Sequence, residues 1–220
     1  MAMPTRKEQR RFLPRRQCRG LRAASWMKVF LIRHGQCEAN LVEEDMRRRM
    51  TREEFNTFMR CSPESLLTSK GEAQAASLAR RFAGVPLARL YASPLPRALA
   101  TATALGKAQG LDPIILPDLR ELMPPPLVVR GGPAPAHRLF LSAYVRMLLA
   151  PSSEDRLSAT LRRARGVWRE ITAEPAEAIA AVSHGWFLTV LLLSVRFERG
   201  WHVVTRDLRN TGVSLVMRRA

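Results

Sequence analysis

The feature that most constrains this chain is a short apolar run that ends abruptly in polar residues. Residues 29–32 are Val-Phe-Leu-Ile and predict a buried strand, because the run is short and β-branched at both ends. Arg33, His34 and Gly35 follow at once, and Gly35 is expected to let the backbone turn sharply and approach a ligand. Open α/β sheets bind ligands beyond the carboxyl ends of their strands. The junction therefore predicts an α/β protein with a ligand site at this strand end.

The side chains at this junction indicate phosphoryl chemistry. A neutral imidazole is a nucleophile, and a guanidinium offers a planar fork of donors to phosphate oxygens. A second junction repeats the design: the apolar run 178–182 leads into Ser183, His184 and Gly185, ahead of an apolar helix expected at 186–195. One such junction also fits a strand that merely happens to end in polar residues, whereas two in one chain favour a shared site.

A third strand end carries Arg97. Residues 87–92 predict a strand, and an Ala-rich helix should follow it, with Ser93 as the N-cap and Pro94 at the first helical position. Arg97 would then lie in the first turn, where a cation opposes the helix dipole and a bound anion would explain it. A surface arginine is the alternative. Since parallel strands end at one edge of a sheet, we expect the three junctions to meet there.

The remaining chain predicts the elements around that edge. Further helices are expected at 67–82, 137–149 and 154–172, and further strands at 113–116 and 212–217. Alternating strands and helices of this kind are typical of α/β folds.

Two segments are expected to border the site. Residues 41–66 predict a charged helical insertion, in which Thr51 and Glu54 have the spacing of a capping box. We interpret the insertion as a lid or flank, although its aromatic residues also fit ordinary packing. Residues 123–135 hold too many Pro and Gly residues for regular structure and predict a long, semi-rigid loop.

The charge balance favours an anionic partner. The net charge is +17 over 220 residues, and the first 26 residues supply eight of the 36 basic residues and one of the 19 acidic ones. We expect residues 1–26 to form a disordered basic tail; a transit peptide and a translation start at Met27 are alternatives. Residues 27–220 remain basic and suffice for one domain, so small phosphates or nucleic acid are favoured as partners.

Other classes of partner find less support. The three cysteines form no paired motif, which indicates a reducing, cytoplasmic setting, and every apolar run is shorter than the roughly 18 residues of a membrane span. Nucleic acid is disfavoured, because the arginines of the helix expected at 154–172 have no interleaved aromatic residues for base stacking. We interpret them as a solvated face; they are Arg156, Arg162, Arg163, Arg165 and Arg169. No feature indicates an oligomeric state.

In chain order, these segments resemble the histidine phosphatase superfamily, also called the phosphoglycerate mutase-like family. The resemblance spans about residues 27–217. The matching pieces are Arg33-His34-Gly35 with Asn40, Leu67-Thr68-x-x-Gly71-x-x-Gln74-Ala75, Ser93-Pro94-Leu95-x-Arg97-Ala98, Leu119-x-Glu121 and Val182-Ser183-His184-Gly185. The resemblance implies a three-layer α/β/α sandwich with a mostly parallel mixed sheet.

The resemblance also implies phosphomonoester hydrolysis without a metal or cofactor. We expect the substrate to be a small phosphorylated metabolite. His34 would attack phosphorus and form a phosphohistidine, while Glu121 would protonate the leaving oxygen and then help to activate water. Other polar groups would surround the phosphoryl group and offset its charge. They are Arg33, Arg97, His184, Asn40 and the amide of Gly185.

The chain departs from the family pattern in two places. Cys37 stands where Ser or Thr is usual, and a thiol is a weak donor of similar size. The residues after Glu121 are Leu-Met-Pro-Pro, in place of the Arg-His-Tyr-Gly usual in the mutases, which favours hydrolysis. Asp118 is the nearest rival of Glu121 as the acid. Two alternatives to a phosphatase of small metabolites stay open: a phosphoprotein (phosphohistidine) phosphatase and a catalytically idle, basic binding protein.

Overall fold

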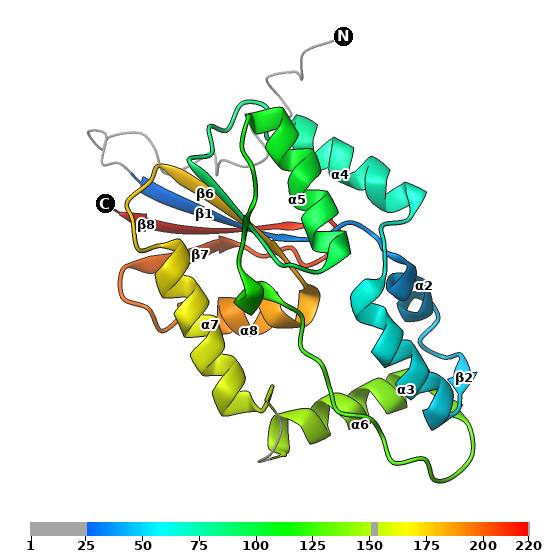
Figure 1. Ribbon diagram of the computed structural model, residues 1–220. Coiled ribbons are helices and arrows are strands. Elements are labelled where there is room, and N and C mark those ends of the chain that lie inside the picture. Colours follow the sequence, from blue (N-terminus) through cyan, green and yellow to red (C-terminus); the bar gives the residue numbers. More distant parts are fainter. Residues whose placement is uncertain (1–25, 151–153, 220) are drawn as a thin grey trace.

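The computed structural model describes residues 26–150 and 154–219, and a six-stranded mixed sheet lies at its centre (Figure 1). The strand order is β4-β3-β6-β1-β8-β7. The first four strands in this order are parallel neighbours, whereas β8 is antiparallel to both β1 and β7. The strands are β1 (Trp26–Arg33), β3 (Arg89–Ala92), β4 (Ile114–Ile115), β6 (Ala178–Ser183), β7 (Trp201–Thr205) and β8 (Val213–Arg219).

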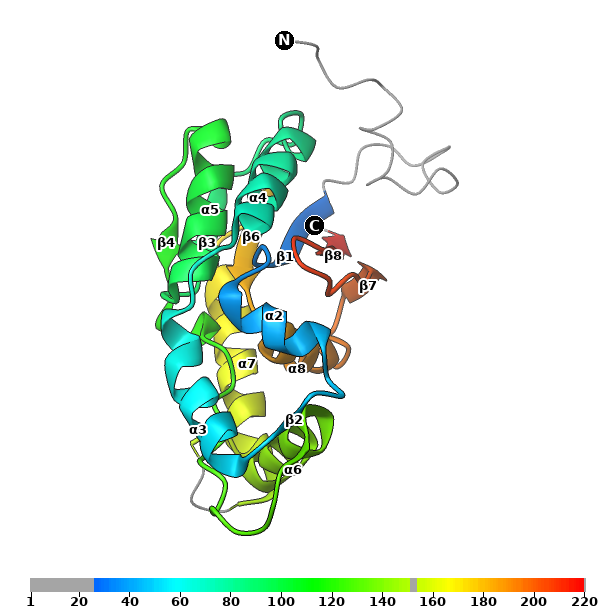
Figure 2. The ribbon, with the colours of Figure 1, turned by 90° about the vertical axis from the view of Figure 1, so that its right-hand side faces the viewer.

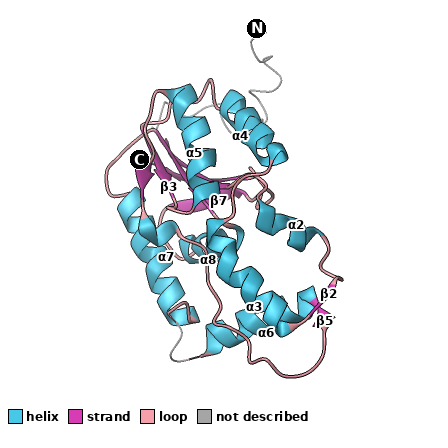
Figure 3. Cartoon of the chain, turned by 45° about the vertical axis from the view of Figure 1, so that its right-hand side comes forward, coloured by secondary structure: helices cyan, strands magenta, loops and turns pink. Residues whose placement is uncertain are grey.

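Helices cover both faces of this sheet (Figures 1 and 3). Helices α4 (Ser69–Arg81) and α5 (Pro96–Gln109) pack on one face, and α7 (Leu157–Ile171) and α8 (Gly185–Val195) pack on the other. Successive residues of β1 serve opposite faces: residues 29 and 31 pack toward α7 and α8, and residues 30 and 32 toward α4 and α5. A strand buried on both faces must be apolar throughout, which explains the run at 29–32. The predicted three-layer α/β/α sandwich with a mostly parallel mixed sheet is confirmed.

A smaller group of elements lies beyond the carboxyl ends of the parallel strands (Figure 2). It contains α2 (Glu38–Glu44), β2 (Arg49–Met50), α3 (Arg52–Cys61), β5 (Ala134–Pro135) and α6 (Ala136–Leu149). Strand β2 pairs with β5, which ties the insertion at 41–66 to the end of the loop at 123–135. The capping box at the start of α3 is confirmed, because the Thr51 hydroxyl accepts from the Glu54 amide and the Glu54 carboxylate accepts from the Thr51 amide.

Several predicted boundaries differ from the structure. Helix α5 begins at Pro96 with Leu95 as its N-cap, so the predictions of Ser93 as N-cap and Pro94 as first helical residue are wrong. Proline suits the first helical position equally at residue 96, because an amide there has no partner within the helix. Helix α7 begins at Leu157 rather than residue 154. Strand β7 was not predicted, because it is an edge strand of mostly exposed and partly exposed residues, formed by pairing with β8.

The structure gives a different reason for the glycine after His34. Gly35 is not among the described residues with positive φ. Instead, a Cβ at Gly35 would lie 2.6 Å from the carbonyl oxygen of Gly71, and a Cβ at Gly71 would lie 1.9 Å from the carbonyl oxygen of Gln36. Both glycines therefore let the chain after β1 pack directly against the start of α4.

Three other expectations concerned the basic tail, the arginines of α7 and membrane-spanning segments. The tail at 1–26 lies outside the described residues, except for Trp26, which begins β1. The interpretation of a solvated arginine face is wrong for Arg163, whose side chain is only 10% exposed. Within residues 26–150 and 154–219, no helix combines the length and apolar character needed to cross a membrane.

Candidate active site

His34 follows the last residue of β1 and is buried. Its Nδ1 lies 2.6 Å from the carbonyl oxygen of Gly35, and Arg97 Nε donates to its Nε2 at 3.3 Å. A carbonyl oxygen only accepts hydrogen bonds, so Nδ1 carries the proton and Nε2 carries the lone pair. Burial, with the positive charges of Arg97 and Arg33, holds the pKa of His34 well below its ordinary value. The ring is therefore neutral, with its nucleophilic nitrogen directed toward Arg97.

His184 lies beside His34, because β6 pairs with β1 in parallel and both strands end at the same edge. The two ring centroids are 5.0 Å apart, and His184 is fully buried as the N-cap residue of α8. Burial holds its pKa well below the ordinary value, and the positive charges of Arg97 and Arg33 act in the same direction. Its Nε2 is 2.8 Å from the Ser93 hydroxyl. Ser93 thus belongs to the site as the partner of His184, a role that its position directly after β3 could have suggested.

Arg97 comes from the first turn of α5, as predicted, and is 4% exposed. Besides its contact with His34, its Nη1 donates to the carbonyl oxygens of Ser62 at 2.9 Å and Pro63 at 3.3 Å. These two carbonyls come from the insertion at 41–66, which therefore fixes the direction of this cation. Both of these acceptors are neutral carbonyl groups, so these two hydrogen bonds leave the guanidinium attractive to an anion.

Arg33 lies against the amino terminus of α8. Its Nη1 donates to the carbonyl oxygen of Leu208 at 3.1 Å. A Cβ at Gly185 would lie 3.4 Å from both Cζ and Nε of Arg33. Gly185 therefore leaves room for the guanidinium close to a helix terminus whose amide dipoles favour an anion.

Asn40 belongs to a hydrogen-bonded group around the start of α2. Its Oδ1 accepts from the amide of Cys37 at 3.1 Å and from Nδ2 of Asn210 at 3.0 Å, and the Cys37 thiol lies 3.4 Å from the same oxygen. Asn210 Nδ2 also donates to the carbonyl oxygen of His34 at 3.2 Å. Asn210 connects Asn40 with the candidate nucleophile, and sequence reasoning missed it because it lies in a loop after β7, far along the chain.

Glu121 approaches from the segment after β4 and meets α8. Its carboxylate accepts from the amides of Leu122 at 3.0 Å, Phe187 at 2.9 Å and Trp186 at 3.3 Å. Burial raises the pKa of this carboxyl, although the three amide donors act in the opposite direction. A raised pKa retains a proton that a leaving group could receive. Asp118, its rival, is exposed and does not line the cavity described next.

One cavity collects most of the predicted residues. His34, Arg33, Arg97, Asn40 and Glu121 line it, whereas His184 and Gly185 do not and lie behind His34 and Arg33. The rest of the wall is mainly apolar and aromatic, and the Tyr144 and Trp186 rings stack within it at 4.6 Å. The other lining residues are Cys37, Ala39, Phe58, Met59, Ser62, Leu122, Met123 and Phe140. Across the described ranges, no group of three or more His, Cys, Asp or Glu residues is placed to hold a metal ion.

This constellation and fold place the chain in a known class. The chain belongs to the histidine phosphatase superfamily (branch 1), whose family model matches residues 29–219. The resemblance found in the sequence is confirmed. That superfamily contains both phosphatases and mutases.

The chain is also similar to individual proteins. A probable phosphoglycerate mutase of Enterobacter sp. (strain 638) is 34% identical over 96 residues, covering 44% of this chain and only 38% of that relative. The phosphoserine phosphatase of Entamoeba histolytica has a TM-score of 0.59 at 21% identity, over 86% of this chain and 89% of that one. A mycobacterial glucosyl-3-phosphoglycerate phosphatase has a TM-score of 0.56 at 20% identity, over 77% and 79%. At these identities the solved structures show a common fold.

Proposed function

We propose that this protein hydrolyses phosphomonoesters through a phosphohistidine formed on Nε2 of His34. The observation that carries the proposal is the tautomer of this ring. The Gly35 carbonyl accepts a hydrogen bond from the Nδ1–H group, so the Nε2 lone pair lies at a cavity lined by two guanidinium groups. A neutral nucleophile next to cations suits attack on a phosphate dianion.

The proposed reaction has two displacements. In the first, the Nε2 lone pair forms a bond to phosphorus, the bond to the leaving oxygen breaks, and Glu121 gives its proton to that oxygen. In the second, water attacks phosphorus, the Glu121 carboxylate takes a proton from the water, and the N–P bond breaks. Inorganic phosphate leaves and His34 returns to its neutral form. Arg33 and Arg97 offset charge on the phosphoryl oxygens in both steps, which is the role that metal ions fill in other phosphoryl-transfer enzymes.

The wall of the cavity supports a small substrate with one anionic group. Among the described residues that line it, Arg33 and Arg97 are the cationic ones, and both lie near His34. The rest of the wall offers aromatic and apolar contacts, which suit a ring or an apolar leaving group and give a second anion no counter-ion. This favours hydrolysis of a small metabolite over phosphoglycerate mutase activity. Phe58 and Met59 of the insertion narrow the same cavity, which counts against a phosphoprotein substrate.

The direct test is hydrolysis of phenyl phosphate in the presence of EDTA. We expect the natural chain to be active and the His34→Ala variant to lose on the order of 10³-fold or more in kcat/KM. His202→Ala is the matched control, because His202 is an exposed residue of β7 outside the cavity, and it should retain full activity. Hydrolysis that survives His34→Ala would remove the proposed nucleophile. An inactive natural chain that binds nucleic acid equally well with and without His34 would support the idle binding protein instead.

A further inference from the structure

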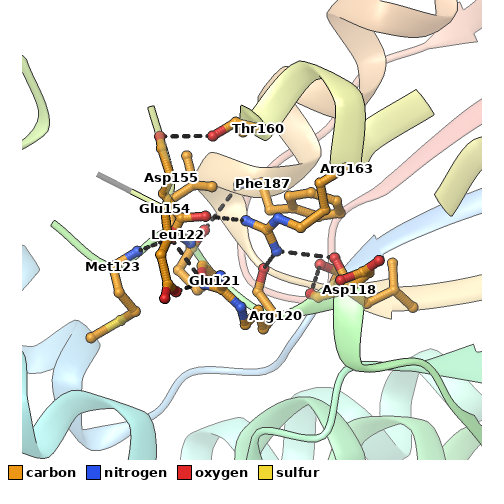
Figure 4. A network of polar contacts seen from close by, with 12 residues as sticks. Asp118, Arg120, Glu121, Leu122, Met123, Glu154, Asp155, Thr160, Arg163 and Phe187 are labelled. Carbon is orange, nitrogen blue, oxygen red and sulfur yellow. Dashed lines mark hydrogen bonds and ion pairs between the residues drawn. The ribbon is translucent and has the colours of Figure 1, made fainter. Parts of the chain in front are cut away.

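We propose that Asp155 is a positioning residue that holds Glu121 at the leaving oxygen of the substrate. This inference rests on the proposed function, in which Glu121 is the acid. Asp155 does not line the cavity, so it is not placed to touch a substrate there. It is nevertheless 3% exposed and stands at the centre of a polar network around the Glu121 segment (Figure 4).

The Asp155 carboxylate contacts residues on both sides of Glu121, the side chain of Arg120 and the backbone of Met123. Its Oδ2 accepts from Arg120 Nη1 at 2.9 Å and from the amide of Met123 at 3.0 Å. Its Oδ1 accepts from Arg163 Nη2 at 3.0 Å. One buried carboxylate thus contacts the residue before Glu121 and the second residue after it.

Arg163, on α7, makes further hydrogen bonds to the same segment. Its Nη1 donates to the carbonyl oxygen of Arg120 at 2.9 Å and to that of Asp118 at 3.0 Å. Its guanidinium also lies 4.4 Å from the centre of the Phe187 ring, and the Phe187 amide donates to the Glu121 carboxylate. Arg163 therefore links the backbone before Glu121 with the helix terminus that Glu121 contacts.

The segment around Glu121 needs such a support because it is not itself part of a helix or a strand. Residues 120–133 form neither helix nor strand, and the stretch after Glu121 is rich in proline. Its position therefore depends on side chains from elsewhere. A displacement of about 1 Å at a reacting group can cost on the order of 10²-fold in rate. Asp155 is the side chain through which Arg120, Arg163 and Met123 are joined.

The test compares two esters that differ in their need for an acid. Phenyl phosphate requires protonation of its leaving oxygen, whereas dinitrophenyl phosphate has a leaving group that departs as a stable anion. We expect Asp155→Asn to lower kcat/KM for phenyl phosphate by about 10- to 100-fold and for dinitrophenyl phosphate by less than about threefold. Asparagine has nearly the same shape but presents an NH₂ group to one of the donors. The ratio kcat/KM reports the first displacement, in which Glu121 acts as an acid.

Further variants separate this proposal from the proposed function. Glu121→Gln should show the same selective loss of kcat/KM for phenyl phosphate. The double variant that also carries Asp155→Asn should lose no more activity than Glu121→Gln alone, because both changes remove the same function, protonation of the leaving oxygen. Glu174→Gln is the matched control: it removes an ion pair with Arg89 at the opposite end of the sheet and should leave both esters unaffected. Thermal unfolding of each variant shows whether it is folded.

Each outcome has one meaning. If Glu121→Gln fails to discriminate between the esters, Glu121 is not the acid and both proposals lose that assignment. Suppose instead that Glu121→Gln is selective while Asp155→Asn lowers kcat/KM equally for both esters or for neither of them. That result overturns only the positioning role of Asp155. If Asp155→Asn does not fold, Arg120→Gln decides, since the Arg120 side chain is one-third exposed and its loss is milder. The same selective loss in that variant supports the proposal, and a uniform or absent effect overturns it.

Discussion

At the scale of the residue, two groups of opposite behaviour lie in one cavity. The proposed nucleophile, His34, has a lowered pKa because it is buried near two guanidinium groups. The proposed acid, Glu121, has a raised pKa because burial outweighs its amide donors. Pairs of titratable groups whose environments shift them toward complementary protonation states are typical of acid–base catalysis.

The pH dependence of kcat/KM should follow from these two shifts. We expect a bell-shaped profile for phenyl phosphate, corrected for the ionisation of the substrate. Activity is lost at low pH as His34 gains a proton, below the ordinary imidazole range, and at high pH as Glu121 loses its proton, above the ordinary carboxyl range. Glu121→Gln should abolish the high-pH limb and retain the low-pH limb. A high-pH limb that persists in this variant would contradict the assignment.

At the scale of the element, the site depends on how closely strand ends and helix starts pack. Gly35 and Gly71 bring the chain after β1 into backbone contact with the start of α4, which fixes the direction in which His34 leaves its strand. The amino terminus of α8 donates two amides to the Glu121 carboxylate, and Gly185 leaves room there for the Arg33 guanidinium. The contact of the chain after β1 with α4 is a close fit of backbone against backbone, in which neither side can shift cheaply.

Two helical glycines provide a matched pair of substitutions. Gly71→Ala should destabilise the fold by about 1–3 kcal/mol, because its Cβ would overlap the backbone oxygen of Gln36, which cannot move aside cheaply. Gly166→Ala in α7 should stabilise it by about 0.5–1 kcal/mol, because a Cβ there meets nothing within 4 Å and alanine favours the helix. Urea unfolding measures both. Equal effects of the same sign would contradict the close-packing explanation.

At the scale of the whole molecule, the burial of neutral histidines makes the free energy of unfolding depend on pH. His34 and His184 are both buried with lowered pKa values, so the unfolded chain gains protons before the folded one as the pH falls. Their contribution to the free energy of unfolding is complete above the pKa that a histidine has in the unfolded chain. It is lost as the pH falls from there toward the lower pKa values of the folded state. Glu121 has a raised pKa and therefore the opposite sign.

This predicts an acid-sensitive fold. In a Glu121→Gln background, the free energy of unfolding should fall by up to about 1.4 kcal/mol per histidine for each pH unit below about 6.5. Replacing His184 by Asn should halve this slope, whereas replacing His202, which is exposed, should leave it unchanged. Urea unfolding at a series of pH values measures it. A slope that does not respond to His184→Asn would show that its burial has no such cost.

The sequence alone determined the layers of this protein and the groups at its strand ends. The apolar runs at 29–32 and 178–182 required strands buried on both faces, and parallel strands necessarily bring His34, Arg97 and His184 to one edge. These inferences were possible because each depends on residues that are neighbours in the chain.

Only the tertiary structure decided which partners those groups have. It placed Ser93 against His184 instead of at a helix start, Asn210 beside Asn40, and Arg163 in a buried network instead of in solvent. It also brought Glu121 to the amino terminus of α8. The physical reason is distance along the chain: local patterns set the direction of each backbone segment, whereas contacts between remote residues depend on how whole elements pack.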